Sequence, residues 1–173
     1  MSNKEKMRWN ILADFILRYK FKTFIEVGTA NGKNLNNILK KIKDVDLKIW
    51  SIDPYECYDE YSTDINGKEE RVKTNYTKAL NTVFKDPRVI HIKEYSNCAR
   101  QLFKPKSIDL IFIDANHSYK YVLDDIKTWT PVVRSGGIIC GHDYRNSNGV
   151  VRAVNDAFSH FHILTDTVWC KQL

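Results

Sequence analysis

The chain has 173 residues, and its 27 lysines and arginines exceed its 21 aspartates and glutamates, which gives a formal net charge of +6 at pH 7. Chains of about this length bury roughly 70% of their unfolded surface, so we expect one domain over residues 1–173. The sequence shows no signal peptide and no apolar run long enough to span a bilayer. Its four scattered cysteines form no C-x-x-C pair, so we expect a cytoplasmic protein with free thiols and no membrane partner.

The first elements alternate between helix and strand. Apolar residues recur at helical spacing from Met7 to Ile16, which predicts an amphipathic helix over residues 4–19 that covers the domain as a lid (residues 1–20). A short apolar strand follows at residues 24–27 and opens into a loop that contains Gly28 and Gly32. A second helix has its apolar residues between Leu35 and Ile42, and the next strand covers residues 48–53.

The same alternation continues to the end of the chain. We predict helices over residues 68–84, 98–103, 121–133 and 150–158, and strands over residues 89–92, 108–113, 137–140, 161–164 and 167–170. In the helix over residues 68–84, we expect Val72, Tyr76, Leu80 and Val83 to face inward. The uninterrupted apolar run at residues 108–113 is typical of a strand in the middle of a parallel sheet. Strands that alternate with helices predict an α/β fold.

Two of these strands end in an acidic residue, which indicates a ligand site. Glu26 lies beside the glycine loop and Asp53 follows the next strand, and ligands of open α/β sheets bind at the carboxyl ends of the strands. The spacing Glu-x-Gly-x-x-x-Gly matches neither a dinucleotide fingerprint nor a P-loop, so phosphate is not the expected ligand. S-adenosylmethionine fits better, because the two acceptor oxygens of Asp53 suit a ribose diol.

Four motifs carry a resemblance to a known family, over residues 21–169. They are Glu26-Val-Gly-Thr-Ala-Asn-Gly32, Ser51-Ile-Asp-Pro-Tyr55, Phe112-Ile-Asp-Ala-Asn-His-Ser-Tyr119 and Ser135-Gly-Gly-Ile-Ile-Cys-Gly-His-Asp-Tyr144. The chain resembles the class I S-adenosylmethionine-dependent methyltransferases, and within them the macrocin and sugar O-methyltransferases and cephalosporin hydroxylase-like proteins. This resemblance implies a Rossmann-like fold with a mostly parallel seven-stranded sheet, helices on both faces and an antiparallel last strand.

The resemblance also implies which residues bind the cofactor, S-adenosylmethionine. These residues are Glu26, Gly28, Thr29, Ala30, Asn31, Gly32, Asp53, Pro54, Tyr55, Ser96, Asn97 and Asp114. Between the second strand and the third helix, residues 56–67 read either as a flap over the substrate, with tyrosines that stack on a ligand, or as a solvated loop.

Chemistry is expected where the fourth and fifth strands end. By resemblance to metal-dependent O-methyltransferases, Asp114, His142 and Asp143 would bind a divalent ion, magnesium or manganese. His142 stands where an acid is common, which favours softer ions, and Asn116 stands where sugar methyltransferases carry a second acid. An amide cannot take up a proton, so we favour His117 as the general base, with Asp114 and Asp143 as its catalytic partners. The requirement for a metal stays open.

We therefore expect an enzyme that methylates a hydroxyl oxygen of a small molecule, such as a sugar or another hydroxylated metabolite. Two alternatives remain: a nucleic-acid methyltransferase, and a protein that binds S-adenosylmethionine without turnover. The lysines from Lys40 to Lys48 and the positive net charge favour nucleic acid weakly, because basic residues near a helix C-terminus also stabilise its dipole. A homodimer through the opening helix and the final strands also remains open.

Overall fold

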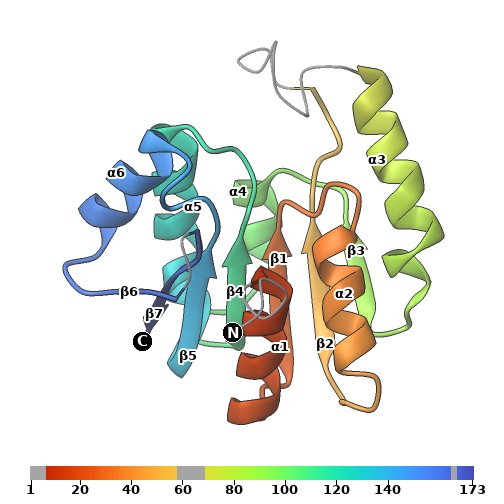
Figure 1. Cartoon of the computed structure of the whole chain (residues 1–173), viewed down its shortest axis with the longest axis horizontal. Coiled ribbons are helices and arrows are strands. Elements are labelled where there is room, and N and C mark those ends of the chain that lie inside the picture. The colour runs from red at the N-terminus through yellow and green to blue at the C-terminus, as the bar shows by residue number, and fades with distance from the viewer. Residues whose placement is uncertain (1–6, 58–68, 165–166) are drawn as a thin grey trace.

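The computed structural model describes residues 7–57, 69–164 and 167–173. Seven strands form one sheet in the order β3-β2-β1-β4-β5-β7-β6 (Figure 1). The strands are β1 (Thr23–Val27), β2 (Lys48–Ile52), β3 (Val89–Ile92), β4 (Ile108–Ile113), β5 (Val133–Gly141), β6 (His162–Ile163) and β7 (Trp169–Gln172). Strands β1 to β5 pair in parallel, whereas β7 runs antiparallel to both of its neighbours. The predicted mostly parallel sheet with an antiparallel last strand is confirmed.

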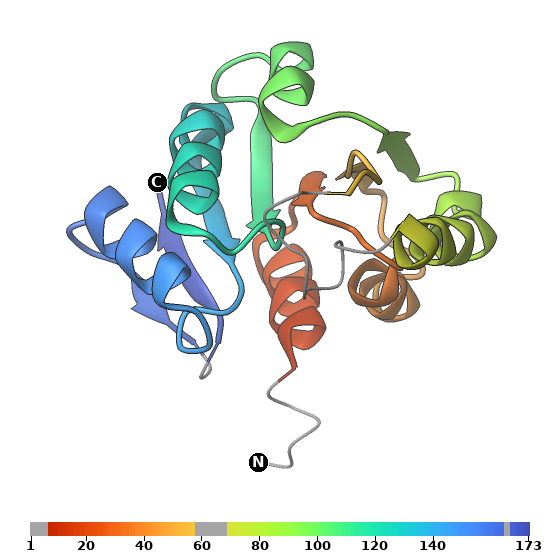
Figure 2. The ribbon, with the colours of Figure 1, turned by 90° about the horizontal axis from the view of Figure 1, so that it is seen from above.

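Helices cover both faces of this sheet. The α-helices are α1 (Arg8–Tyr19), α2 (Lys33–Lys41), α3 (Glu69–Asn81), α4 (Ser96–Ala99), α5 (Tyr119–Trp129) and α6 (Asn148–Ala157), and short 3₁₀ turns are η2 (Val83–Lys85), η3 (Arg100–Leu102) and η4 (Thr130–Val132). Seen from above, α1 and α2 lie on one side of the sheet and α4 and α5 on the other (Figure 2). The core divides in the same way into two clusters, one with α1, α2 and α3 and one with α4, α5 and α6.

Alternation along the strands produces these two clusters. In β1, Phe24 packs into the cluster with α1 and α2, and Ile25 packs into the cluster with α5, because successive side chains of a strand point to opposite faces. All six residues of β4 are buried, as expected for a central parallel strand that is covered on both sides.

The topology creates a crevice at the carboxyl ends of β1 and β4. These neighbours pair in parallel, but the chain leaves β1 toward α2 on one face and leaves β4 toward α5 on the other. The Gly28 N–H donates to Ile52 O and the Asp114 N–H donates to Val27 O, both at 2.8 Å, so the loops after β1, β2 and β4 start at one level. Open α/β sheets bind ligands at such a switch point.

Several predicted details differ from the structure. Leu80 was expected to face inward but is 43% exposed, and Val72, Asn75 and Ala79 are the buried residues of α3. Residues spaced by four along a helix drift by about 40° per step, so Leu80 has rotated away from the face that Val72 defines. Strand β5 begins at Val133, four residues earlier than expected. The expected residues 4–6 of the opening helix, and Lys68 of the third, lie outside the described residues.

Among the helices built from the described residues, none combines the length and apolarity that a membrane span requires.

Candidate active site

A cavity of about 1230 Å³ opens at the carboxyl ends of the parallel strands. It is lined by twelve of the residues expected to bind cofactor, metal or substrate: Gly28, Thr29, Ala30, Asn31, Asp53, Pro54, Ser96, Asn97, Asp114, His117, His142 and Asp143. Within the described residues, Glu26, Gly32 and Tyr55 are not part of its wall. The sequence prediction therefore groups residues that line one cavity with residues that support it from behind.

The glycine loop packs against the chain after β4. A Cβ atom on Gly28 would lie 2.3 Å from the carbonyl oxygen of Asp114 and 2.7 Å from the Cα of Ala115, and the φ angle of Gly28 is +87°. Any larger residue would push these two loops apart. Gly32 has a φ angle of +73° and approaches the Val83 side chain, where a Cβ would lie 2.8 Å away. Both glycines thus permit close packing between segments of the protein.

Asp53 ties the loop after β2 to the glycine loop. Its Oδ2 accepts hydrogen bonds from the backbone N–H groups of Thr29 (3.0 Å) and Ala30 (2.9 Å), and its Oδ1 accepts one from the Tyr55 N–H (2.8 Å). Burial raises the pKa of Asp53, and the three backbone donors oppose this shift. A carboxylate has about four acceptor positions, so the internal bonds leave Asp53 little capacity for a ligand hydroxyl.

Glu26 lies below the cavity, where it is 1% exposed. Its Oε1 accepts a hydrogen bond from the Asn34 side chain at 2.7 Å, which fixes the first turn of α2 to β1. Burial raises the pKa of Glu26 to about 8, although the bond from Asn34 opposes the rise. Glu26 is therefore largely protonated at neutral pH and can donate a hydrogen bond as well as accept one.

Tyr55 also supports the loop. Its side chain is 8% exposed, and its hydroxyl donates to the carbonyl of Ala30 at 2.7 Å. The ring packs against Tyr76 and His91. The expected flap over residues 56–67, with Tyr58 and Tyr61, falls almost wholly outside the described residues.

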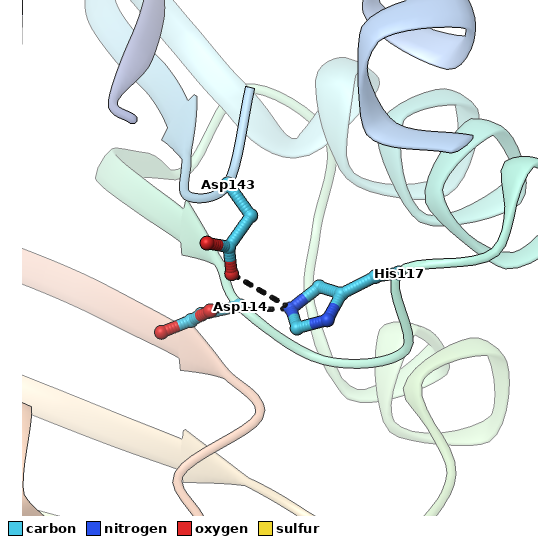
Figure 3. Close-up of side chains that lie close together, drawn as sticks. All are labelled: Asp114, His117 and Asp143. Carbon is cyan, nitrogen blue, oxygen red and sulfur yellow. Dashed lines mark ion pairs between the residues drawn. The ribbon is translucent and has the colours of Figure 1, made fainter. Parts of the chain in front are cut away.

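At the other side of the cavity, Asp114, His117 and Asp143 converge (Figure 3). His117 Nε2 lies 3.1 Å from Asp143 Oδ2 and 3.6 Å from Asp114 Oδ1. Asp114 and His117 follow β4, and Asp143 follows β5, so the pairing of two neighbouring strands brings them together. The His117 side chain is 35% exposed, which leaves it accessible from the cavity.

The surroundings of Asp143 favour its ionised form. Burial disfavours its charged form, but hydrogen bonds from His142 and Asn146 and the charge of nearby His117 outweigh burial and hold the pKa of Asp143 well below its usual range. Asn146 Nδ2 donates to Asp143 Oδ1 at 2.9 Å, which leaves Oδ2 directed at the two histidines. A permanently charged carboxylate beside His117 stabilises the protonated imidazole.

Arg8 of α1 reaches the outer side of the same cluster. Its Nη1 lies 3.3 Å from His142 Nε2, and its Nε lies 3.5 Å from Asp114 Oδ2. The Thr167 hydroxyl lies 3.0 Å from the same Nε2. A guanidinium only donates hydrogen bonds, so Nε2 of the neutral ring accepts and the ring proton sits on Nδ1. That Nδ1 lies 3.0 Å from Asp143 Oδ2, to which it donates. The contact spans 134 positions of the sequence, and no local pattern signals it.

The same geometry bears on the expected metal ligands. Asp114, His117 and Asp143 each offer one ligand atom, and these atoms lie within 4.8 Å of one another. Two carboxylates and an imidazole suit a divalent ion such as manganese. His142 was expected to complete the set with Asp114 and Asp143, and its Nδ1 lies 3.0 Å from Asp143 Oδ2 and 3.8 Å from Asp114 Oδ1. The set with His142 stays a prediction beside the group that includes His117.

Asn116 has a local role in the turn before α5. Its side chain is 8% exposed, and its Oδ1 accepts a hydrogen bond from the Ser118 N–H at 2.9 Å. This bond shapes the turn that leads from β4 into α5.

Comparison with known proteins identifies the family of this chain. A family model described as a methyltransferase domain matches residues 25–144. An uncharacterized protein, R132, of Acanthamoeba polyphaga mimivirus is 35% identical over 143 residues, which make up 77% of this chain and 58% of the relative. This chain thus matches little more than half the length of that relative.

Two solved structures share the fold at low sequence identity. The SAH-bound methyltransferase PaMTH1 of Podospora anserina superimposes with a TM-score of 0.67 at 13% identity, over 99% of this chain and 82% of that protein. An O-methyltransferase from Bacillus cereus in complex with SAH gives a TM-score of 0.59 at 14% identity, over 98% of this chain and 81% of that protein. The family model covers more than half of the sequence, so the chain belongs to a methyltransferase domain family and has the Rossmann-like fold of class I methyltransferases.

Proposed function

We propose that this protein transfers the methyl group of S-adenosylmethionine to a hydroxyl oxygen of a small molecule, such as a sugar or another hydroxylated metabolite. The observation that carries the proposal is the position of Asp114, His117 and Asp143 in the wall of a cavity that also contains the glycine loop and Asp53. One cavity thus combines a nucleoside-type crevice with an imidazole held beside two carboxylates.

The cofactor lies along the loops after β1 and β2. Its ribose faces Asp53 and the backbone from Gly28 to Asn31, and its sulfonium faces the end of β4. Three backbone N–H groups already bond to Asp53. Asp53 therefore acts first by fixing the shape of this loop, and the ribose takes the remaining acceptor position.

The reaction is an in-line displacement. The acceptor oxygen forms a bond to the methyl carbon while the bond from that carbon to sulfur breaks, and the bonding electrons stay on sulfur, which becomes the neutral thioether of S-adenosylhomocysteine. His117 Nε2 faces the carboxylates of Asp143 and Asp114 and carries the ring proton, so the hydroxyl proton passes to Nδ1 of His117. The carboxylates of Asp143 and Asp114 stabilise the imidazolium and hold the ring toward the acceptor, which combines general base catalysis with positioning.

A divalent ion fits the same three residues. Asp114, His117 and Asp143 would hold it, and it would supply Lewis acidity that lowers the pKa of the acceptor hydroxyl. A neutral imidazole whose Nε2 binds the ion carries its proton on Nδ1 and has no lone pair left to take up another. Loss of activity on chelation, with activity restored by manganese or magnesium, would therefore assign His117 to the metal, and activity in the presence of a chelator would assign it to the proton.

The test is methyl transfer from S-adenosylmethionine labelled on the methyl group, with a panel of sugars and phenols as acceptors. We expect label in at least one hydroxylated product, and a fall in turnover of about 10²-fold or more in His117→Ala. Oligonucleotides are assayed in parallel. Labelling of oligonucleotides in place of the small acceptors would support the nucleic-acid alternative, and intact cofactor binding with no product from any class would support a non-catalytic role.

A further inference from the structure

A chain of three hydrogen-bonded side chains lies in the cavity wall away from the reactive cluster. The Trp129 Nε1–H donates to Ser96 Oγ at 2.8 Å, and the Ser96 hydroxyl donates to Asp125 Oδ1 at 2.5 Å. Trp129 is fully buried and Asp125 is 9% exposed, while Ser96 and Asp125 both line the cavity. Ser96 begins α4, and the other two residues lie on α5, so the chain also joins these helices.

The donors and acceptors in this chain have a fixed direction. An indole nitrogen only donates, an ionised carboxylate only accepts, and a hydroxyl has one proton and two lone pairs. Ser96 uses its proton on Asp125 and one lone pair on Trp129, which leaves it a single lone pair. While Asp125 is ionised, the side chains of Ser96 and Asp125 therefore present acceptors and no donor toward the cavity.

The proposed cofactor places its base at this wall. Its sulfonium must face Asp114, His117 and Asp143, where Arg8 of α1 approaches from one face of the sheet. The α4–α5 wall lies on the opposite face (Figure 2). A nucleoside whose ribose lies at Asp53 between these two walls therefore points its base at Ser96.

We propose that Asp125 is a positioning residue that selects a 6-aminopurine, because it accepts the hydrogen bond of the Ser96 hydroxyl and leaves that hydroxyl able only to accept from a ligand. The exocyclic amine of adenine supplies the required N–H donor. A 6-oxopurine presents a carbonyl acceptor at that position, and two acceptors facing each other lose the bond and repel. The inference rests on the proposed use of S-adenosylmethionine, and the sequence resemblance assigned no role to Asp125.

The test compares two ligands by calorimetry: S-adenosylhomocysteine and its deaminated analogue S-inosylhomocysteine. Burial raises the pKa of Asp125 to about 7, with the bond from Ser96 opposing and Asp124 adding to the rise. Measurements at about pH 8.5 therefore keep the carboxylate ionised. We expect the wild type to prefer the adenine ligand by about tenfold or more. In Asp125→Asn the new amide can donate to Ser96, which frees the serine proton, so the preference falls to about threefold or less.

Controls separate this role from simple structural support. Asp14→Asn, on the exposed side of α1, keeps the wild-type preference. A uniform loss of affinity for both ligands in Asp125→Asn, or a wild type that binds both equally, overturns the inference while the proposed function stands. A wild type that binds neither ligand overturns both. If Asp125→Asn fails to fold, Ser96→Ala decides, because it removes the acceptor; a wild-type preference in that variant contradicts the inference.

Discussion

The two halves of the cavity use their carboxyl groups in opposite ways. After β1 and β2, Glu26 and Asp53 are buried, and Glu26 Oε1 and both oxygens of Asp53 accept hydrogen bonds from the protein itself. After β4 and β5, Asp114 and Asp143 direct oxygens at His117, which is 35% exposed to the cavity. The carboxyl groups after β1 and β2 therefore support the loops, and we call this part the scaffold half. The carboxylates after β4 and β5 face the place where a substrate would lie, and we call this part the reactive half.

This difference shows that acidic residues at the ends of strands can have two roles, one in supporting the loops and one in facing the substrate. An acid at the end of a strand suggests ligand binding in both halves, but neighbouring backbone donors decide whether its oxygens are available. Asp53 follows a strand beside a loop with two backbone N–H groups directed at it. Asp143 instead contacts side chains: Asn146 at Oδ1 and the two histidines at Oδ2. Substitutions in the first half should therefore affect stability and binding, and substitutions in the second should affect turnover.

The largest effect is expected at His117. His117→Ala removes the group that takes up the acceptor proton, so turnover should fall by about 10²- to 10⁴-fold while the Kd for S-adenosylmethionine changes by about threefold or less. Single-turnover kinetics and calorimetry measure the two quantities. His160→Ala, at an exposed position outside the cavity, is the control. An equal loss of affinity and turnover would show that His117 holds the cofactor.

A substitution at Gly28 tests how much the loop after β1 contributes to stability. Gly28→Ala places a methyl group 2.3 Å from Asp114 O at a φ angle of +87°, so the free energy of unfolding should fall by about 3 kcal/mol or more. Gly136→Ala is a matched control, because it has a φ angle of +76° but its nearest contact is an Arg134 side-chain nitrogen at 3.3 Å. We expect a loss of about 1 kcal/mol there. Urea unfolding measures both free energies. If the two variants lose the same free energy of unfolding, the contact between Gly28 and Asp114 adds nothing to the cost of the strained backbone conformation.

Glu26 should give stability a distinct pH dependence. Its pKa rises on folding from 4.5 to about 8, so the folded state binds the proton more tightly. Stability from this group is complete below pH 4.5 and is lost as pH rises toward 8, by on the order of 2 kcal/mol or more. Glu26→Gln keeps the shape without the titration, so its unfolding free energy should change less over this range. Parallel pH profiles of the two proteins would contradict the assignment.

Arg8 should give the smallest effect. Arg8→Met removes the positive charge beside Asp114 and one of the two partners of His142 Nε2, while the Thr167 hydroxyl remains. Turnover should therefore fall by about three- to tenfold, with little change in cofactor affinity. Arg18→Met, on the exposed side of the same helix, controls for a general change in α1. If the Arg8→Met variant is as active as the wild type, Arg8 has no role in turnover.

The sequence predicts the fold well because strand and helix periodicity, together with four motifs, determine it. It also predicts most of the cavity wall, since the carboxyl ends of parallel strands meet at one edge. It fails where the outcome depends on distant partners. Arg8 contacts a residue 134 positions away, and the bond between Asp125 and Ser96 crosses from α5 to α4. Leu80 was misplaced because the buried face of α3 includes the polar Asn75, which interrupts the apolar pattern.

The measurement that tests the account most directly is calorimetric titration of the purified protein with S-adenosylmethionine and S-adenosylhomocysteine, with and without magnesium or manganese. We predict micromolar binding of both ligands, and clearly weaker binding in Asp53→Ala, because the loop and the ribose lose one carboxylate. An absence of binding to either ligand under all metal conditions would contradict the proposed function and the assignment of the cavity.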